Sequence, residues 1–196
     1  FGEAKSPPFD GHFNYRSVIG KLLHLSVTRM DIAFAVSQCS RFCADPKVEH
    51  GKAVTWIGRY LVATRDKGTI YTPRDEGFHI HVHSDCAGNW DKDNADWDKD
   101  TARSRAGYII TYAGCPVYWQ SKLITEIALS TTKAEYVAAS EALRSVIPMI
   151  RLMDELQGRG FTVFSSPPQL HCKLFEDNSG ALEMLRVPRF RPRTKH

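Results

Sequence analysis

The spacing of apolar residues changes from a helical period to a strand period near residue 67, and this change restricts the folds that the chain can adopt. Before it, the segments 15–25, 30–42 and 46–64 carry apolar residues three and four positions apart, as amphipathic helices do. After it, Phe78, Ile80 and Val82 alternate with histidines, as in a half-buried strand. We therefore expect a helical region at 1–66 and a mixed α/β region at 67–196.

The remaining elements follow from period and from turn residues. Two or three further strands are expected at 107–114, 116–121 and, as the optional third, 125–130, and another strand at 169–176. A long helix should run from Thr132 to Gln157, kinked or broken at Pro148. Asp45 is expected to cap the helix that follows it, with Pro46 in the first helical position. The order strand, strand, strand, helix, strand, helix indicates an α/β fold.

Composition favours a soluble globular protein. Of the 196 residues 42% are hydrophobic, and the net charge of +4 permits a polyanionic partner without requiring one. No apolar run is long enough to cross a bilayer, and the first residues lack the layout of a signal peptide. The five cysteines form no C-x-x-C pair, so we expect reduced thiols. These features predict an intracellular protein, cytoplasmic or nuclear, without a membrane partner.

Several motifs resemble one family. S-T-T-K-A-E-Y at 130–136, E-D-N-S-G-A at 176–181 and R-P-R-T-K-H at 191–196 resemble the polyproteins of copia-type (Pseudoviridae) LTR retrotransposons. T-A-R-S-R at 101–105 and Y-A-G-C-P at 112–116 narrow the resemblance to one group of these elements. The segments before residue 66 resemble the C-terminal end of the family's reverse transcriptase, but no Y-x-D-D-like sequence is present, so this piece should not polymerise DNA.

The resemblance implies that residues 67–196 form a ribonuclease H-like domain. Its expected fold is a mixed sheet, antiparallel over the first three strands, with flanking helices; the last strand and helix of that fold are missing from these residues. Its implied activity is two-metal hydrolysis of the RNA strand of RNA–DNA hybrids, with Mg²⁺ held by carboxylates. The implied partner is therefore an RNA–DNA hybrid or another nucleic acid.

Two family carboxylates match this chain. Glu135 matches the glutamate near the start of the long helix, and Asp177 matches the carboxylate after the fourth strand. Each residue has a purely structural alternative. Glu135 could close a T-x-x-E capping box with Thr132, and Asp177 could cap the following helix.

The first family carboxylate is replaced. When H-S-D-C-A-G is aligned on Ala87 and Gly88, the catalytic aspartate falls on His83, a poor magnesium ligand, and Asp85 takes the variable position two residues later. Asp85 should lie about 6–7 Å farther along an extended strand, too far to replace that ligand without rearrangement. The fourth carboxylate is absent from these residues. We thus expect a site of Glu135, Asp177, Asp85 and His83, of which the three carboxylates bind Mg²⁺ weakly and hydrolysis is impaired.

Two further groups of residues, the strand histidines and the basic tail, are candidate binding sites, and one alternative function remains open. The alternating histidines before Asp85 could bind zinc or copper, or could simply be a polar strand face. The tail could bind nucleic-acid phosphates or could be a solvated loop, and its candidate contacts are Arg189, Arg191, Arg193 and Lys195. The rival function is a catalytically inactive remnant that serves as a nucleic-acid-binding or scaffolding subunit of a larger protein assembly.

Overall fold

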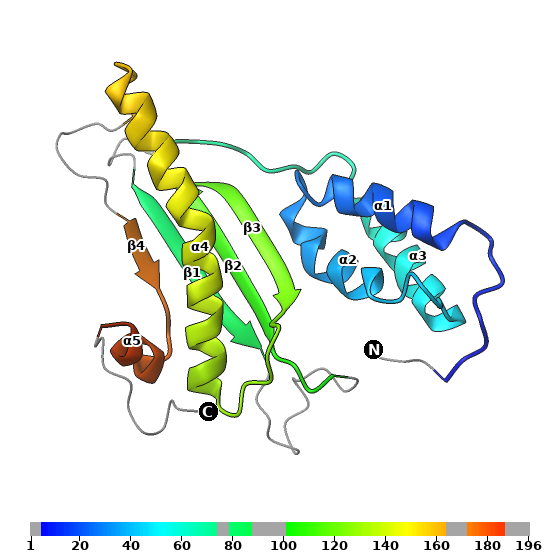
Figure 1. The fold of residues 1–196 in the computed structure, drawn as a ribbon. Coiled ribbons are helices and arrows are strands. Elements are labelled where there is room, and N and C mark those ends of the chain that lie inside the picture. Colours follow the sequence, from blue (N-terminus) through cyan, green and yellow to red (C-terminus); the bar gives the residue numbers. More distant parts are fainter. Residues whose placement is uncertain (1–4, 74–78, 88–100, 164–171, 187–196) are drawn as a thin grey trace. The chain divides into compact units, whose positions relative to one another are not determined.

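The structure is a computed structural model that describes residues 5–73, 79–87, 101–163 and 172–186 (Figure 1). The chain divides into two compact units, Phe1–Ile70 and Tyr71–His196. All five cysteines are free thiols. In the described parts of the chain, no helix is both long and apolar enough to cross a membrane.

The first unit is helical. It contains α1 (Tyr15–Leu25), a short 3₁₀ helix η1 (Met30–Ile32), α2 (Ala33–Ser40) and α3 (Val48–Ala63). α1 begins after Asn14, whose Oδ1 accepts the amide hydrogen of Ser17 at 3.0 Å. The apolar stripes of the helices meet in one buried core that comprises Tyr15, Ile19, Leu22, Ile32, Val36, Cys39, Val54 and Ile57.

α3 begins later than the sequence pattern predicts. Its first residue is Val48, so the prediction that Asp45 caps it with Pro46 in the first turn is wrong. The backbone on either side of Lys47 instead forms hydrogen bonds with residues 7–9, and this pairing holds it extended. His50 then closes the helix start, since its Nδ1 accepts the Lys47 amide hydrogen at 3.1 Å.

The second unit is a four-stranded mixed sheet with two helices. Its strands are β1 (Ile80–Ala87), β2 (Arg105–Tyr112), β3 (Cys115–Leu123) and β4 (Cys172–Phe175), in the order β3-β2-β1-β4. β1 pairs antiparallel with β2 and parallel with β4, and β2 pairs antiparallel with β3. The helices are α4 (Thr131–Gly158) and α5 (Ser179–Arg186). The expected α/β class with a mixed sheet is confirmed.

β2 and β3 are joined by a tight turn at Ala113 and Gly114. Both residues have positive φ, +52° and +76°, which is the conformation that two-residue hairpins require. Gly114 adopts it without cost, whereas Ala113 carries a Cβ that disfavours it. The register shifts by one residue between Thr111 and Ile110, and beyond this irregularity Tyr108 and Gln120 are register partners. The Tyr108 hydroxyl donates to Gln120 Oε1 at 2.7 Å.

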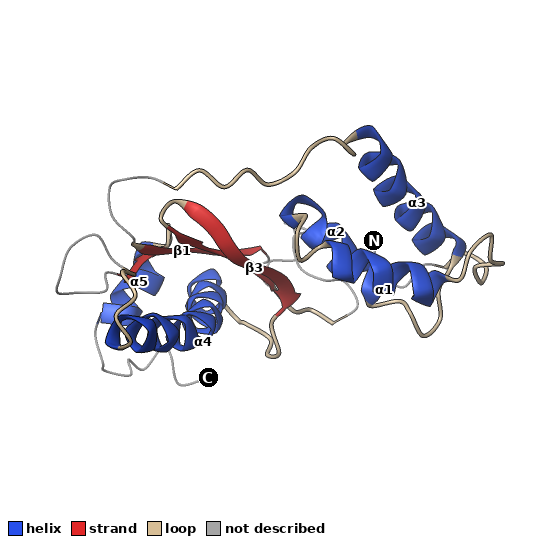
Figure 2. Cartoon of the chain, turned by 90° about the horizontal axis from the view of Figure 1, so that it is seen from above, coloured by secondary structure: helices blue, strands red, loops and turns tan. Residues whose placement is uncertain are grey.

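α4 lies along one face of the sheet (Figure 2). Its contact stripe is made of small side chains, which lets the helix approach the strands closely: Ala134, Ala138, Ala139 and Ala142 are fully buried. Ala142 and Val146 pack with Ile80, Val82 and Ile110, and Ala134 and Ala138 pack with Ala106.

Two expectations about this region need correction. Pro148 lies inside α4, but the helix continues unbroken through it to Gly158. The optional strand at 125–130 does not form. Ile124 and Ala128 are buried against Ala134 and Ala138, so this connection supplies side chains to the core without pairing its backbone in the sheet.

Candidate metal centre

The parallel pairing of β1 and β4 brings Asp85 and Asp177 to the same end of the sheet. The register matches Ile80 with Cys172 and continues to His83 with Phe175. Two further steps at the same offset reach Asp85, which lies near the carboxyl end of β1, and Asp177, which follows the carboxyl end of β4. Because the strands are parallel, both residues lie at the end of the sheet where α/β folds commonly place ligand sites.

Glu135 joins them from α4. This helix begins at Thr131 with Ser130 as its N-cap, and Ser130 Oγ accepts the Lys133 amide hydrogen at 3.2 Å. The cap therefore lies two residues before Thr132, and the proposed capping box between Thr132 and Glu135 does not form. Glu135 lies in the second turn with 7% of its surface exposed, and its side chain is not used to start the helix.

Asp177 is also free of the structural role considered for it. Asn178 caps α5, since its Oδ1 accepts the Ala181 amide hydrogen at 3.0 Å. Gly180 allows α5 to lie close to the start of α4, because a Cβ there would be 3.2 Å from the Thr132 side chain. This close approach carries Asp177 toward Glu135.

The three carboxylates converge. Each of Asp85, Glu135 and Asp177 offers an oxygen within 4.8 Å of the oxygens of the other two, and in the described part of the chain they form the one such group with metal-ligand spacing. Asp85 and Asp177 are exposed, whereas Glu135 is buried behind them. The group thus opens to solvent on one side and is closed by α4 on the other.

The electrostatics of Glu135 are unfavourable without a cation. Burial, followed by the negative charges of Glu176, Asp85 and Asp177, raises its pKa to about 8. A hydrogen bond from the Cys86 backbone acts in the opposite direction. The Oε2 atom of Glu135 is buried and has no hydrogen-bond partner. Three hard oxygen donors, one of them orphaned, fit a divalent cation such as Mg²⁺ or Mn²⁺.

His83 lies apart from this group. Its ring stacks on Phe175 with the centroids 4.7 Å apart and the planes 9° apart. Alignment on Ala87 and Gly88 gives His83 the position of the family's first carboxylate, and Asp85 was expected to lie too far along the strand to replace it without rearrangement. In the structure Asp85, and not His83, lies within metal-ligand spacing of Glu135 and Asp177. The strand histidines also belong to no group with metal-ligand spacing among the described residues. His79 and His81 have nearly parallel rings, 6.3 Å apart, and the pKa of His81 is lowered by burial and then by the charge of Lys173.

Glu176 is a carboxylate that the sequence argument did not single out. Its Oε2 accepts the Ser84 hydroxyl hydrogen at 2.9 Å, and its Oε1 accepts the Asn178 amide hydrogen at 3.2 Å. The nearby Cys86 thiol has its pKa raised to about 12 by burial and by the charges of Glu135, Asp85 and Glu176. The signal that could have identified Glu176 is its place immediately before Asp177 in the E-D-N motif.

The predicted nucleic-acid contacts of the tail cannot be placed. They all lie outside the described residues: Arg189, Arg191, Arg193 and Lys195.

Similarity to known proteins covers nearly the whole chain. The Retrovirus-related Pol polyprotein from transposon TNT 1-94 of Nicotiana tabacum is 36% identical over 186 residues, which are 93% of this chain and 12% of that protein. The corresponding polyprotein from transposon RE1 of Arabidopsis thaliana is 34% identical over 184 residues, 93% of this chain and 11% of that protein. The chain thus spans only about a tenth of the length of these relatives.

A third relative is much shorter. Secreted RxLR effector protein 161 of Plasmopara viticola is 36% identical over 136 residues, which are 68% of this chain and 89% of that protein. No protein-family model matches the chain. No solved structure matches it either.

Proposed function

Because nearly the whole chain is similar to a short segment of retrotransposon Pol polyproteins, we propose that its second unit is a ribonuclease H-like domain of that family. The proposed activity is cation-dependent hydrolysis of the RNA strand of an RNA–DNA hybrid, at a reduced rate. The segment 1–66 is then the C-terminal end of a reverse transcriptase. Both assignments, ribonuclease H and reverse transcriptase, come from the sequence motifs and not from the names of the similar polyproteins.

The proposal rests above all on Glu135. A carboxylate that is 7% exposed, with one oxygen unpartnered and two further carboxylates within 4.8 Å, destabilises a fold. The N-caps of α4 and α5 are supplied by Ser130 and Asn178, so helix capping does not account for the acidic group. Cation binding does account for it, since a divalent ion offsets the repulsion.

The division of roles follows from burial. Asp85, Glu135 and Asp177 would hold the cations, which when bound supply an activated water and stabilise the leaving oxygen of an in-line displacement. Glu135 closes the inner side of the site and excludes bulk water there. Asp85 and Asp177 are exposed, so a phosphodiester can reach the site from their side.

The proposed rate is reduced because His83 stands at the aligned position of the family's first carboxylate. Among the described residues three carboxylates come together, and Asp85 is the one that β1 contributes. A group with fewer negative charges holds a second cation beside the first more weakly. We therefore expect slow cleavage.

The decisive experiment is cleavage of an RNA–DNA hybrid labelled on the RNA strand, with Mg²⁺ and with Mn²⁺. We expect slow cleavage that stops in EDTA and in Asp85→Asn, and that continues in His83→Ala. His83→Ala is the matched control, because it changes the same strand two residues away while leaving the carboxylates intact. Wild-type rates in Asp85→Asn would refute the assignment of Asp85, and equal loss in both variants would refute the distinction between them.

A second candidate is a non-catalytic binding or scaffolding protein. The short effector relative favours it, because the chain covers 89% of a protein whose name is not that of a polyprotein. A segment like this one can therefore make up most of a separate protein. This candidate predicts that the chain retains binding to nucleic acid or to a protein partner while showing neither cation binding nor cleavage, which the same assay with a binding titration distinguishes.

A further inference from the structure

The described residues beside the carboxylates include a polar chain that links β1 to α5. Ser84, on β1 between His83 and Asp85, is 8% exposed, and its hydroxyl donates to Glu176 Oε2 at 2.9 Å. Glu176 Oε1 accepts the Asn178 amide hydrogen at 3.2 Å. Asn178 in turn caps α5 through its side chain. Asp177 therefore lies between two residues whose positions are fixed by hydrogen bonds.

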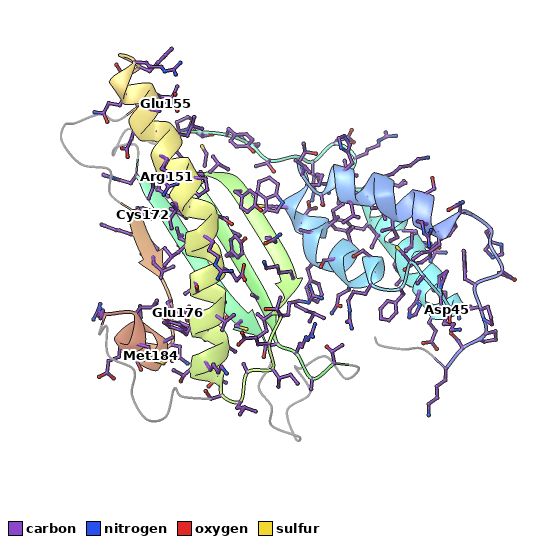
Figure 3. The ribbon with its side chains drawn as sticks, viewed as in Figure 1. Asp45, Arg151, Glu155, Cys172, Glu176 and Met184 are labelled. Atoms are coloured by element: carbon purple, nitrogen blue, oxygen red, sulfur yellow. The ribbon has the colours of Figure 1, made fainter. Side chains whose placement is uncertain are left out.

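The Ser84–Glu176 bond replaces the backbone ladder where the ladder ends. Backbone pairing between β1 and β4 stops at His83 and Phe175, and Ser84 and Glu176 are the next pair at the same offset of 92 positions. Without this side-chain bond, the two segments would be unjoined just before they reach Asp85 and Asp177. Figure 3 shows Glu176 near the base of α4, close to α5.

Glu176 differs from the three carboxylates of the candidate site. Both of its oxygens are engaged, and it is not part of the group that lies within metal-ligand spacing. It is accordingly suited to orient a ligand rather than to be one. Side chains that hold metal ligands in place through hydrogen bonds commonly change cation affinity by about 10- to 100-fold when they are replaced.

We infer that Ser84 and Glu176 are positioning residues that hold Asp177 at the distance from Asp85 and Glu135 that a divalent cation requires. The inference rests on the proposed cation site. It assigns to Ser84 a role that its place on the inward face of a strand does not reveal, and it gives Glu176 a function within an already crowded acidic region.

A competing account is that Glu176 acts through its charge alone, because its negative charge also raises the pKa of Glu135. Glu176→Gln separates the two accounts. The glutamine oxygen can accept the Asn178 amide hydrogen while its NH₂ donates to the Ser84 hydroxyl oxygen, since a serine hydroxyl is both donor and acceptor. This variant keeps both contacts and removes the charge, whereas Glu176→Ala removes both.

The test is calorimetric titration of the full chain with MnCl₂ and with MgCl₂. We expect Ser84→Ala and Glu176→Ala to weaken binding about 10-fold. Glu176→Gln and Ser84→Thr, which retain the contacts, should stay within about 3-fold of the wild type, by the same reasoning. Ser145→Ala is the control, because Ser145 lies about 15 Å along α4 from Glu135 and its hydroxyl contacts Tyr108 rather than a carboxylate of the site, so cation affinity should be unchanged.

The outcomes separate this inference from the proposed function. If Asp177→Asn abolishes binding while Ser84→Ala and Glu176→Ala bind as the wild type does, the site stands and the positioning inference fails. If Glu176→Gln loses as much affinity as Glu176→Ala, charge is the cause and the inference also fails. If the wild type binds neither cation, both proposals fail. Should Glu176→Ala not fold, as judged by circular dichroism, the comparison of Ser84→Ala with Ser84→Thr decides.

Discussion

Replacing Glu135 with glutamine should stabilise the chain when divalent cations are absent. Glu135 is buried, one of its oxygens has no partner, and three neighbouring carboxylates raise its pKa together with burial. Glutamine has nearly the same shape and carries no charge. Its NH₂ group can also donate hydrogen bonds to the neighbouring carboxylates, so repulsion is exchanged for attraction.

The size of the effect follows from the pKa of Glu135. Folding raises this pKa from 4.5 to about 8, so the cost is absent below pH 4.5 and grows as the pH rises toward 8. At pH 7 the folded chain holds a proton that the unfolded chain has released, and at roughly 1.4 kcal/mol per pKa unit this costs about 3 kcal/mol as an upper value. We expect Glu135→Gln to raise the free energy of unfolding by about 1–3 kcal/mol and Tm by about 3 °C or more.

The assay is urea and thermal unfolding at pH 7, first in EDTA and then with Mg²⁺ or Mn²⁺ in excess. A cation at 100 times its Kd should stabilise the wild type by about 2.7 kcal/mol, and it should stabilise Glu135→Gln far less. The difference between the two proteins should therefore shrink or reverse when the cation is added. Glu141→Gln is the control on the same helix: Glu141 Oε2 lies 2.8 Å from Lys122 Nζ, so its loss should destabilise slightly in both conditions.

The reasoning would be refuted by a Glu135→Gln variant that is less stable than the wild type in EDTA. That result would mean that the glutamate makes favourable contacts which outweigh its desolvation and the repulsion from its neighbours. If Glu135→Gln were more stable than the wild type by the same amount in EDTA and with saturating cation, the cost of burying Glu135 would be confirmed but the cation site would be contradicted.

Three further predictions concern the rest of the chain. Gly51→Ala should destabilise the first unit by about 1–3 kcal/mol in urea unfolding, because the new Cβ would lie 2.3 Å from the Phe9 ring. The control is Gly58→Ala on the same helix, whose Cβ meets nothing within 4 Å and which should be neutral or stabilising by up to about 1 kcal/mol. A tolerated Gly51→Ala would show that the Phe9 contact is not maintained in solution. Asp31→Asn should cost about 1 kcal/mol at pH 7, since the hydrogen bond from Arg29 lowers the pKa of Asp31 to about 2 and solvent screens the partly exposed pair. This contribution is present above about pH 4 and lost as the pH falls toward 2, so the gap between Asp31→Asn and the wild type should close over that range, and a constant gap would contradict the pairing. Finally, if about three tail residues touch phosphate, the slope of log affinity for an RNA–DNA hybrid against log salt concentration should be near −3. The slope should flatten in the variant with alanine at Arg189, Arg191, Arg193 and Lys195. Equal affinity of the wild type and this variant at low salt would exclude the tail as a binding element.

Local sequence predicted most of the secondary structure and named the three carboxylates that lie together in the structure, Asp85, Glu135 and Asp177. The three helices of the first unit and the long helix α4 follow from apolar spacing, because amphipathic stripes need no distant partner to be recognised. Glu135 and Asp177 were identified from motifs that include their own neighbours in the chain. Their independence from helix capping was not visible in the sequence, since Thr132 and Asp177 have the residue types that a cap requires.

Distant contacts decided the points at which the sequence pattern was misleading. α3 starts at Val48 rather than at Pro46 because the preceding backbone pairs with residues 7–9. The segment 125–130 was expected as an optional strand, yet in the described structure it forms none and instead supplies Ala128 to the core beneath α4. α4 continues through Pro148 without a break, and its buried residues from Ala134 to Val146 pack in the core before that position.

The clearest case is the relation between His83 and Asp85. The sequence named both as site residues on one strand, with His83 at the aligned position of the family's first carboxylate and Asp85 as the cation ligand, and judged Asp85 too distant to replace that carboxylate without rearrangement. The parallel register between β1 and β4 decides which of the two lies beside the other carboxylates, because it joins residues 92 positions apart, matches His83 with Phe175 and carries Asp85 toward Asp177. A strand's own sequence fixes which side chains share a face, but only its pairing with a distant strand fixes which of them lies beside a given carboxylate.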